Sequence, residues 1–451
     1  EDLLVVIMQR QCVGLLSYTR KSEGIRRWFC GYCDWSLHRK SKPTNAELSM
    51  WVDNYLRLTD FSSKKRVCMS DILSSSNELS PERSKLLTSA LLVSNSGIRF
   101  AMTLRSDVQK ILSHARASED IEFLSHVGLK SLNEFLQAWL SAVFCNNALI
   151  LQRITFESSS GLVLQNIANA EAVHRIRALS EMKNRLSNGR RCFALFHPSL
   201  PHDPLTFVHI ALSSDIVISM RDIYGSQELE NPHCAMYYSV NSPHSSLGGL
   251  DLAANLLKRA AHEIQRLHPS VTTHCTLSPI PGFMNWLRKR SIEGKLVYPI
   301  PRLLFESLRA TLGRNGQSEE AEYVIETRKL LADLYELLGS EGWHNDEVLC
   351  AELKAPVTWL CAHYLVHEKV GSRSKGQLPY DAVARFHLRN GASLYQLNWL
   401  ANTSHTGIST SAGLMVNYKY DLKDQDDNIR LFDESGGSFK IHDRINDILE
   451  L

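Results

Sequence analysis

The stretch Thr276-Leu277-Ser278-Pro279-Ile280-Pro281-Gly282-Phe283 joins a short strand-like segment to a helical pattern that begins near Gly282. Pro279, Pro281 and Gly282 restrict the backbone directly after Ser278, so the serine hydroxyl is held in place rather than left on a mobile surface. Most Ser-Pro turns only separate two elements of secondary structure. By itself, the stretch therefore leaves a structural and a functional interpretation open.

The composition is that of a folded globular protein. The chain has 451 residues, of which 44% are hydrophobic and 22% charged, which suffices for two or three domains with substantial cores. The formal net charge of +2 does not provide the broad basic surface of a duplex-binding protein, so nucleic acid is not expected as a partner. The longest early apolar run, Leu3 to Met8, is far shorter than a bilayer span, and no membrane partner is expected.

Ten cysteines are scattered without a disulfide framework, which favours a reducing compartment. One pair, Cys30-Gly31-Tyr32-Cys33, forms a CxxC, but its neighbours offer neither the strand nor the helix of a redox site. Zinc would need two further ligands, and Cys12, Cys68 and His38 do not stand at a recognised spacing. We expect two partly buried thiols in a helical region, and no metal site.

The first part of the chain, residues 1–182, has helical patterning. Ser80 is a candidate N-cap for a helix from Pro81 to Leu92, with proline at the first helical position. From Leu132 to Phe144 the apolar stripe is too wide for a lone surface helix, so it must pack on two sides. This part is predicted to be an all-α scaffold or oligomerisation domain.

Strands are predicted after a turn at 187–191. Cys192–Phe196, Thr206–Leu212 and Ala235–Val240 have strand-like composition, and the proline-rich connection His197–Pro204 separates the first two. Residues 183–451 are therefore predicted to form a second domain, of mixed sheet and helices.

A pair of glycines, Gly248 and Gly249, follows the third of these strands and precedes an amphipathic helix from Leu252 to Leu267. Glycines let a ligand approach the backbone, and the first amide groups of a helix are unpaired, so an anion could bind here. The pattern is neither the Rossmann nor the Walker motif. Two basic groups, Lys258-Arg259 and Arg288-Lys289-Arg290, are candidates for phosphate contacts or ordinary solvated helix faces.

A histidine in the last part of the chain, His387, lies between Phe386 and Leu388 just before an Asn-Gly pair. On these residues alone it is a half-buried packing residue or a catalytic group. The segment from Gly413 to Tyr420 follows it after a further apolar run.

Several long motifs together resemble one family. HPSLPHDPLTFVHIAL, GGLDLAANLLKR, TLSPIPGF, FHLRNGASLYQLNWLA and SAGLMVNYKY occur in the order and approximate spacing of the malonyl-CoA decarboxylases. The resemblance extends from about Leu151 to Leu422, whereas the first third shares only its helical character.

The resemblance implies an α+β protein in which an N-terminal helical bundle used for oligomerisation precedes a GNAT-like (acetyltransferase-type) catalytic domain with a mixed sheet. It also implies a homo-oligomer, expected to be a tetramer, that acts inside the cell, with mitochondria favoured over peroxisomes or cytoplasm. The chain begins at Glu1 without an initiator methionine, which leaves a processed or truncated amino terminus open.

The site residues are likewise implied by the resemblance. The family's catalytic serine and histidine fall on Ser278 and His387, an important acidic residue on Asp203, and a tyrosine near the site on Tyr420. The segment that binds malonyl-CoA falls on Gly248, Gly249, Leu250, Asp251, Leu252, Ala253 and Ala254. Asp203 and Asp251 stand where the family usually has glutamate, one methylene longer.

The expected reaction converts malonyl-CoA to acetyl-CoA and carbon dioxide through a thioester enolate, without metal or organic cofactor. We assign His387 as the proton donor to the enolate carbon and Ser278 as the group that orients the malonyl carboxylate. The amides near Gly248 and Gly249 would bind the pyrophosphate of coenzyme A. Phe283 and Phe386 are candidates for apolar walls around the carboxylate.

Two other functions stay open. A serine hydrolase would use Ser278 as nucleophile, but the serine is not in a GxSxG motif, and Pro279 has no amide for an oxyanion hole. A coenzyme A-binding sensor or scaffold without catalysis is the other alternative, favoured by the two shortened acids and disfavoured by the intact Ser278 and His387.

Overall fold

The computed structural model describes residues 43–73, 79–117, 127–145, 148–187, 189–225, 228–314, 323–371 and 377–451. These residues form two compact units. The first comprises residues 43–152, Leu195–Thr206 and Ser242–Asn255, and the second comprises Arg153–Ala194, Phe207–Asn241 and Leu256–Leu451. Each unit therefore contains segments from distant parts of the sequence. The predicted boundary after residue 182 stays a prediction.

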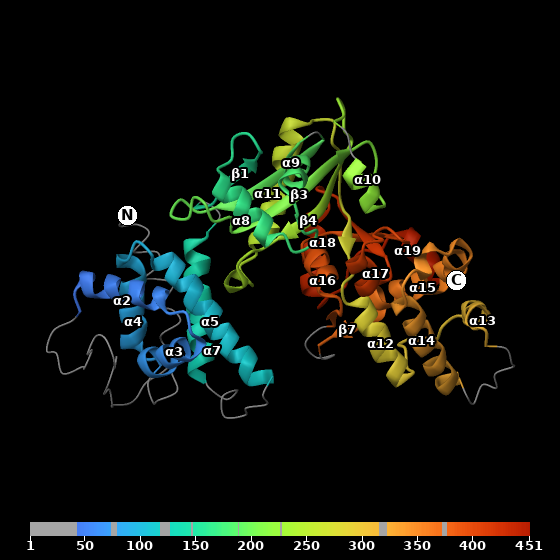
Figure 1. Cartoon of the computed structure of the whole chain (residues 1–451), viewed down its shortest axis with the longest axis horizontal. Helices are drawn as coiled ribbons and strands as arrows, with labels where there is room; N and C mark the ends of the chain where they lie inside the picture. The colour runs from blue at the N-terminus through green and yellow to red at the C-terminus, as the bar shows by residue number, and fades with distance from the viewer. Residues whose placement is uncertain are drawn as a thin grey trace. The chain divides into compact units, whose positions relative to one another are not determined.

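Helices dominate the first unit. They are α2 (Asn45–Arg57), α3 (Phe61–Arg66), a π-helical turn (Val67–Ile72), α4 (Pro81–Val93), α5 (Gly97–Ala117) and α7 (Val127–Val143). The side chain of Ser80 accepts the Arg83 amide and caps α4, and Pro81 occupies the first helical position, as predicted. Figure 1 shows α5 and α7 side by side. The buried residues of α7, which include Leu132, Leu136, Trp139 and Leu140, lie along one stripe, and the helix packs on α5. The predicted packing on two sides stays a prediction.

The second unit contains most of the sheet; the ends of some strands and the first turn of the helix that begins at Leu252 fall within the bounds of the first unit. Its strands are β1 (Ile150–Ile154), β2 (Arg190–Phe196), β3 (Thr206–Ser213), β4 (Cys234–Asn241), β5 (Thr273–Thr276), β6 (Ser278–Pro279), β9 (Ser393–Asn398) and β10 (Met415–Tyr420), with a separate pair β7 (Lys369–Val370) and β8 (Leu378–Pro379). Its helices are α8 (Gly161–Ala170), α9 (Leu179–Leu186), α10 (Met220–Gly225), α11 (Leu252–Leu267), α12 (Phe283–Glu293), α13 (Arg302–Thr311), α14 (Tyr323–Gly339), α15 (Glu347–His367), α16 (Ala382–Arg389), α17 (His405–Ser411), α18 (Gln425–Glu434) and α19 (Asp443–Leu449).

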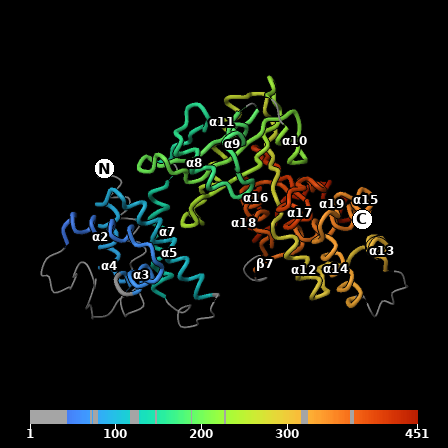
Figure 2. Tube along the Cα trace, viewed as in Figure 1, coloured from blue at the N-terminus to red at the C-terminus, as the bar shows by residue number. Residues whose placement is uncertain are grey.

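The sheet is mixed. Its strands follow the order β1-β2-β3-β4-β5-β10-β6, and β9 also pairs with β10. β4 runs parallel to β5, whereas β10 is antiparallel to β5, β6 and β9. Every residue of β2 is buried, so this strand is covered on both faces. Figure 2 shows the Cα trace of α12 running beside that of α14. The prediction of an α+β protein, with a helical N-terminal region before a mixed-sheet domain, is confirmed. The GNAT-like character of that domain stays a prediction.

Two local predictions need correction. The strand β1 lies inside the region predicted to be helical throughout. Ser278 and Pro279 form the short strand β6 rather than a turn. The proline is tolerated there because β6 lies at the end of the strand order.

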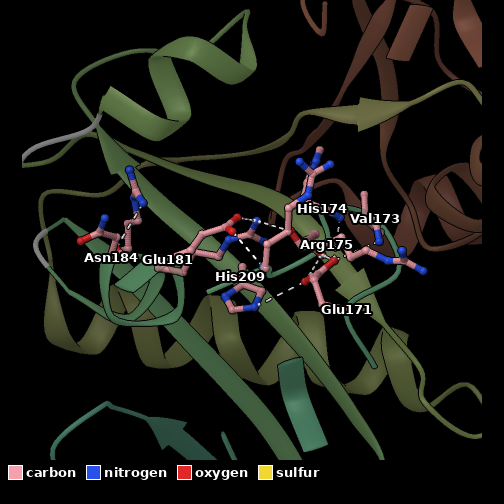
Figure 3. Close-up of polar contacts among 11 residues, drawn as sticks. Glu171, Val173, His174, Arg175, Glu181, Asn184 and His209 are labelled. Carbon is pink, nitrogen blue, oxygen red and sulfur yellow. Dashed lines mark hydrogen bonds and ion pairs between the residues drawn. The ribbon is translucent and has the colours of Figure 1, made fainter. Parts of the chain in front are cut away.

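A buried polar cluster joins the loop after α8 to strands β3 and β4 (Figure 3). One Glu171 oxygen accepts the amides of Val173 and His174 at 3.0 and 2.9 Å, and both oxygens lie 2.8 Å from the Ser239 hydroxyl. Nε2 of His209 lies 3.5 Å from the other Glu171 oxygen. A buried carboxylate is costly unless it is hydrogen-bonded in this way. The cluster therefore fixes the loop to the sheet.

Several histidines of the second unit are buried as neutral side chains. Burial lowers the histidine pKa from its ordinary value of 6.5 to about 3 or about 4 at His174, His209, His274, His363 and His387. In the unfolded chain the same groups bind a proton below pH 6.5, whereas the native protein excludes it. Native stability is therefore expected to decrease as the pH falls from 6.5 toward 4.

We predict that each of these histidines contributes on average about 1 kcal/mol of stability loss per pH unit over this window, with a limit of about 1.4 kcal/mol. Urea unfolding between pH 7 and pH 5 measures the slope. A variant that removes one group, His363→Gln, should show a slope shallower by about 1 kcal/mol per pH unit. An unchanged slope in a cooperatively unfolding His363→Gln protein would contradict a neutral buried His363.

Candidate active site

Strand β10 positions Ser278. It pairs with β5 at one end, where Tyr420 lies opposite His274, and with β6 at the other, where Val416 lies opposite Ser278. Between the two pairings, the amide of Tyr418 donates to the hydroxyl of Thr276 at 3.1 Å. The serine thus lies on a backbone that is hydrogen-bonded on both sides of the break between β5 and β6.

The side-chain amide of Asn417 fixes the same segment from within the sheet. It donates to the Thr276 carbonyl at 2.7 Å, and its oxygen accepts from Asn398 at 2.7 Å. The amide of Leu277 donates to the Tyr237 carbonyl of β4 at 3.1 Å. All these groups are buried, so the position of Ser278 depends on contacts from three strands.

Helix α16 carries His387, and its first turn is firmly held. Asp381 accepts the amide of Ala384 at 2.8 Å as N-cap, and its other oxygen accepts the Tyr364 hydroxyl at 3.0 Å. At the other end, the side chain of Asn390 donates to the Phe386 carbonyl at 2.7 Å. A helix held at both ends presents His387 in one orientation, and the imidazole is buried.

The structure brings His387, Ser278 and Tyr420 together. Nε2 of His387 lies 3.1 Å from the Ser278 hydroxyl, and Nδ1 lies 2.9 Å from the Tyr420 hydroxyl. The imidazole stacks on the ring of Tyr418 at 4.6 Å between centroids and an interplanar angle of 22°. Two hydrogen bonds and a stacked ring leave the histidine little rotational freedom.

The hydrogen bond that Ser278 donates favours one tautomer of His387. Ser278 donates its proton to the hydroxyl of Thr276 at 3.0 Å. The serine oxygen is then the acceptor toward His387, so Nε2 carries the proton, and Nδ1 accepts from Tyr420. In a serine hydrolase the proton of the nucleophile points to the histidine instead. The resting arrangement is therefore that of a hydrogen-bonding serine rather than an activated nucleophile.

Burial keeps this group of residues uncharged. It lowers the pKa of His387 to about 3, so the imidazole is neutral at physiological pH. Burial also raises the pKa of Tyr420 and of Tyr418 well above the ordinary tyrosine range. Any proton that His387 donates therefore comes from a neutral imidazole.

The other predicted site residues belong to the first unit. Asp203 pairs with Arg99 of α5 at 2.7 Å, and Gly248 to Ala254 form the loop before α11 and its first turn.

Three of the basic residues considered for phosphate contacts have acidic partners. Lys258 lies 3.9 Å from Asp426, Lys289 lies 3.9 Å from Glu293, and Arg290 contacts Glu293 and Glu368.

Phe283, considered as an apolar wall of the site, is fully buried against Trp286 and Tyr364, which makes it a core residue.

Sequence reasoning missed Thr276 and Tyr418. A signal was available for both, because residues two apart in a strand face the same way. Thr276 stands two residues before Ser278, and Tyr418 two before Tyr420. Reading these pairs as same-face neighbours would have added a hydroxyl and an aromatic ring to the site.

Other predictions concern metals, membranes and the CxxC. Cys30 and Cys33 lie outside the described residues. In the part of the chain that the structure describes, no group of histidine, cysteine or acidic residues is arranged to hold a metal ion. No described helix is both long and apolar enough to cross a membrane.

Comparisons with known proteins identify the family. The family model of the malonyl-CoA decarboxylase C-terminal domain matches residues 147–447. Mitochondrial malonyl-CoA decarboxylases of Anser anser anser and Rattus norvegicus are 35% and 34% identical over 343 and 344 residues, which is 74% of this chain in each case. The chain spans 62% and 64% of the length of these relatives.

Solved structures share the fold. A malonyl-CoA decarboxylase from Agrobacterium vitis matches with a TM-score of 0.70 and 22% identity, over 90% of this chain and 95% of the other. One from Cupriavidus metallidurans matches with a TM-score of 0.67 and 28% identity, over 90% and 94% of the two chains. With a family model that matches most of its length, the chain belongs to the malonyl-CoA decarboxylase family.

Proposed function

We propose that this protein decarboxylates malonyl-CoA to acetyl-CoA and carbon dioxide, as a cofactor-independent carboxy-lyase. The observation that carries the proposal is the buried contact of His387 with Ser278 and Tyr420 in a chain of this family. The family resemblance adds the proposal of a homo-oligomer, expected to be a tetramer. A mitochondrial location is proposed because the named relatives are mitochondrial enzymes.

The reaction needs an electron sink and a proton. The bond between the carboxylate carbon and the α-carbon breaks, carbon dioxide leaves, and the electron pair moves into the thioester carbonyl as an enolate. A proton must then reach the α-carbon. The thioester is itself the sink, so the protein has to orient the carboxylate, stabilise the enolate oxygen and deliver the proton.

In the proposed mechanism, the neutral imidazole of His387 donates its Nε2 proton to the enolate carbon. A thioester enolate is a strong base, so it does not require an imidazolium as donor. Tyr420 holds Nδ1 as an acceptor and thereby keeps the transferable proton on Nε2. A proton from solvent restores the group after turnover. Ser278 orients the malonyl carboxylate and connects it to His387.

Coenzyme A is assigned to the loop before α11. The first-turn amides of Leu252, Ala253 and Ala254 have no partner within the helix, because an α-helix begins with unpaired donors. Gly249 has a φ of 81° and Asp251 a φ of 51°. Aspartate tolerates this left-handed region better than the longer glutamate, which fits the departure from the family pattern at this position. Asp203 is kept in the proposed site on the resemblance alone.

Incubation with malonyl-CoA tests the proposal directly. We expect acetyl-CoA and carbon dioxide in equal amounts, measured by chromatography and by trapping of carbon dioxide. Release of free malonate would indicate the serine hydrolase instead. Binding without any product would indicate the sensor or scaffold.

Replacement of His387 tests the proton donor. In His387→Ala, turnover of malonyl-CoA should decrease by at least about a hundredfold, because general acid catalysis is lost. His363→Gln is a suitable control: His363 is also buried, and glutamine can still accept the Tyr298 amide that Nε2 accepts at 3.1 Å. The control should keep turnover within about threefold. Near-normal turnover in a folded His387→Ala protein would sink the assignment.

The resting hydrogen bonds predict that Ser278 forms no covalent intermediate. Its proton is directed to Thr276, and Pro279 offers no amide for an oxyanion. Intact-mass spectrometry of protein quenched during turnover should therefore show the unmodified chain. An acyl group on the peptide that contains Ser278 would overturn this role.

A further inference from the structure

A buried arginine of the first unit, called the helical unit from here on, contacts the loop that leads into α11. This residue is Arg105. Arg105 is on α5 and is only 2% exposed. Its guanidinium donates to the carbonyl of Ser246, to that of Gly248 at 3.0 Å, and to the side-chain oxygen of Gln137 at 2.8 Å. A further bond of 3.3 Å reaches the side-chain oxygen of Asn133. These partners are neutral oxygens, so the loop and α7 hold the guanidinium without a carboxylate among them.

Gln137 of α7 extends the same contact along the loop. Its amide nitrogen lies 3.4 Å from the carbonyl of Gly249, while its oxygen accepts from Arg105. A Cβ atom at Gly249 would lie 3.0 Å from that amide nitrogen, and the residue has a φ of 81°. Glycine is therefore favoured here by the backbone conformation, and a side chain at this position would displace the end of Gln137.

These contacts determine which way the loop amides point. In a trans peptide unit the carbonyl and the following amide point in opposite directions. Since the carbonyl of Gly248 points to Arg105, the amide of Gly249 points away from it. It stands three residues before Leu252, where the unpaired first-turn amides of α11 begin.

We infer that Arg105 and Gln137 are positioning residues for coenzyme A. They hold the carbonyls of Ser246, Gly248 and Gly249 and so fix the backbone of this segment, with the amide of Gly249 and the first-turn amides of α11 preorganised for the phosphates. Arg105 also adds a positive charge on the far side of the loop, which favours an anion. The inference rests on the proposed function, and it gives the helical unit a part in substrate binding beyond the oligomerisation expected from sequence.

Direct binding of coenzyme A, measured by calorimetry, tests the inference without requiring turnover. Arg105→Gln should weaken binding at least about tenfold, because a buried charged donor to two loop carbonyls is lost. Gln137→Leu should also weaken coenzyme A binding, by a smaller factor. This variant tests the inference if Arg105→Gln does not fold. Unchanged affinity in either folded variant would overturn the inference.

A matched control separates positioning from general destabilisation. Arg83 of α4 is also buried in the helical unit, and it donates to the carbonyl of Ile72 at 3.1 Å, away from this loop. Arg83→Gln is expected to lower the melting temperature and to leave coenzyme A affinity unchanged. Equal loss of affinity in Arg83→Gln and Arg105→Gln would reduce Arg105 to a structural role and overturn the inference.

A phosphate-free substrate supplies the sharpest comparison. Malonyl-pantetheine has the reacting thioester but no phosphate. Arg105→Gln should lower kcat/KM for malonyl-CoA at least about tenfold through KM and leave kcat/KM for malonyl-pantetheine unchanged. Equal losses on the two substrates would contradict the inference. A wild-type chain that binds coenzyme A but makes no acetyl-CoA would refute the proposed function alone, and one that binds no coenzyme A would refute both.

Discussion

The pairing of β10 with both β5 and β6 is the constraint on which the site depends. One strand spans the break at Leu277, so Thr276 and Ser278 are fixed by the same partner. The same strand supplies Tyr418, which stacks on His387, and Tyr420, which binds its Nδ1. A shift of β10 by one residue would turn its side chains, Tyr418 and Tyr420 among them, to the other face of the sheet. The register of this strand therefore determines whether a site exists at all.

Burial gives the site its chemical character. With a pKa of about 3, His387 is neutral, and its tyrosine neighbours are neutral as well. A buried neutral histidine needs a fixed hydrogen-bond partner on each nitrogen, and Ser278 and Tyr420 are those partners. The result is a site with a defined tautomer and no charge of its own, which suits a reaction whose charge arrives with the substrate. The cost is sensitivity to acid, because the same burial opposes protonation of the native state.

The helical unit contributes contacts to the segments proposed to bind the substrate. On α5, Arg99 pairs with Asp203 and Arg105 holds the carbonyls of the loop before α11. The two segments that carry the resemblance within this unit thus depend on one helix. The Arg99 pair is exposed on the arginine side and contributes little stability, whereas Arg105 is buried and its loss would leave loop carbonyls unpaired. Helix α5, which lies in the region predicted from sequence to be a scaffold, holds a proposed substrate site in place.

The family, most of the elements and the proposed pair Ser278 and His387 could be predicted from the sequence alone, because long motifs, capping residues and apolar periodicity are local properties. The helix from Pro81 and the helix Leu252–Leu267 were predictable for that reason. The tautomer and low pKa of His387, the roles of Thr276 and Tyr418, and the position of Arg105 under Gly248 became visible only in the fold. They depend on burial, on strand register and on contacts of which several join residues more than a hundred positions apart, and no local pattern encodes these.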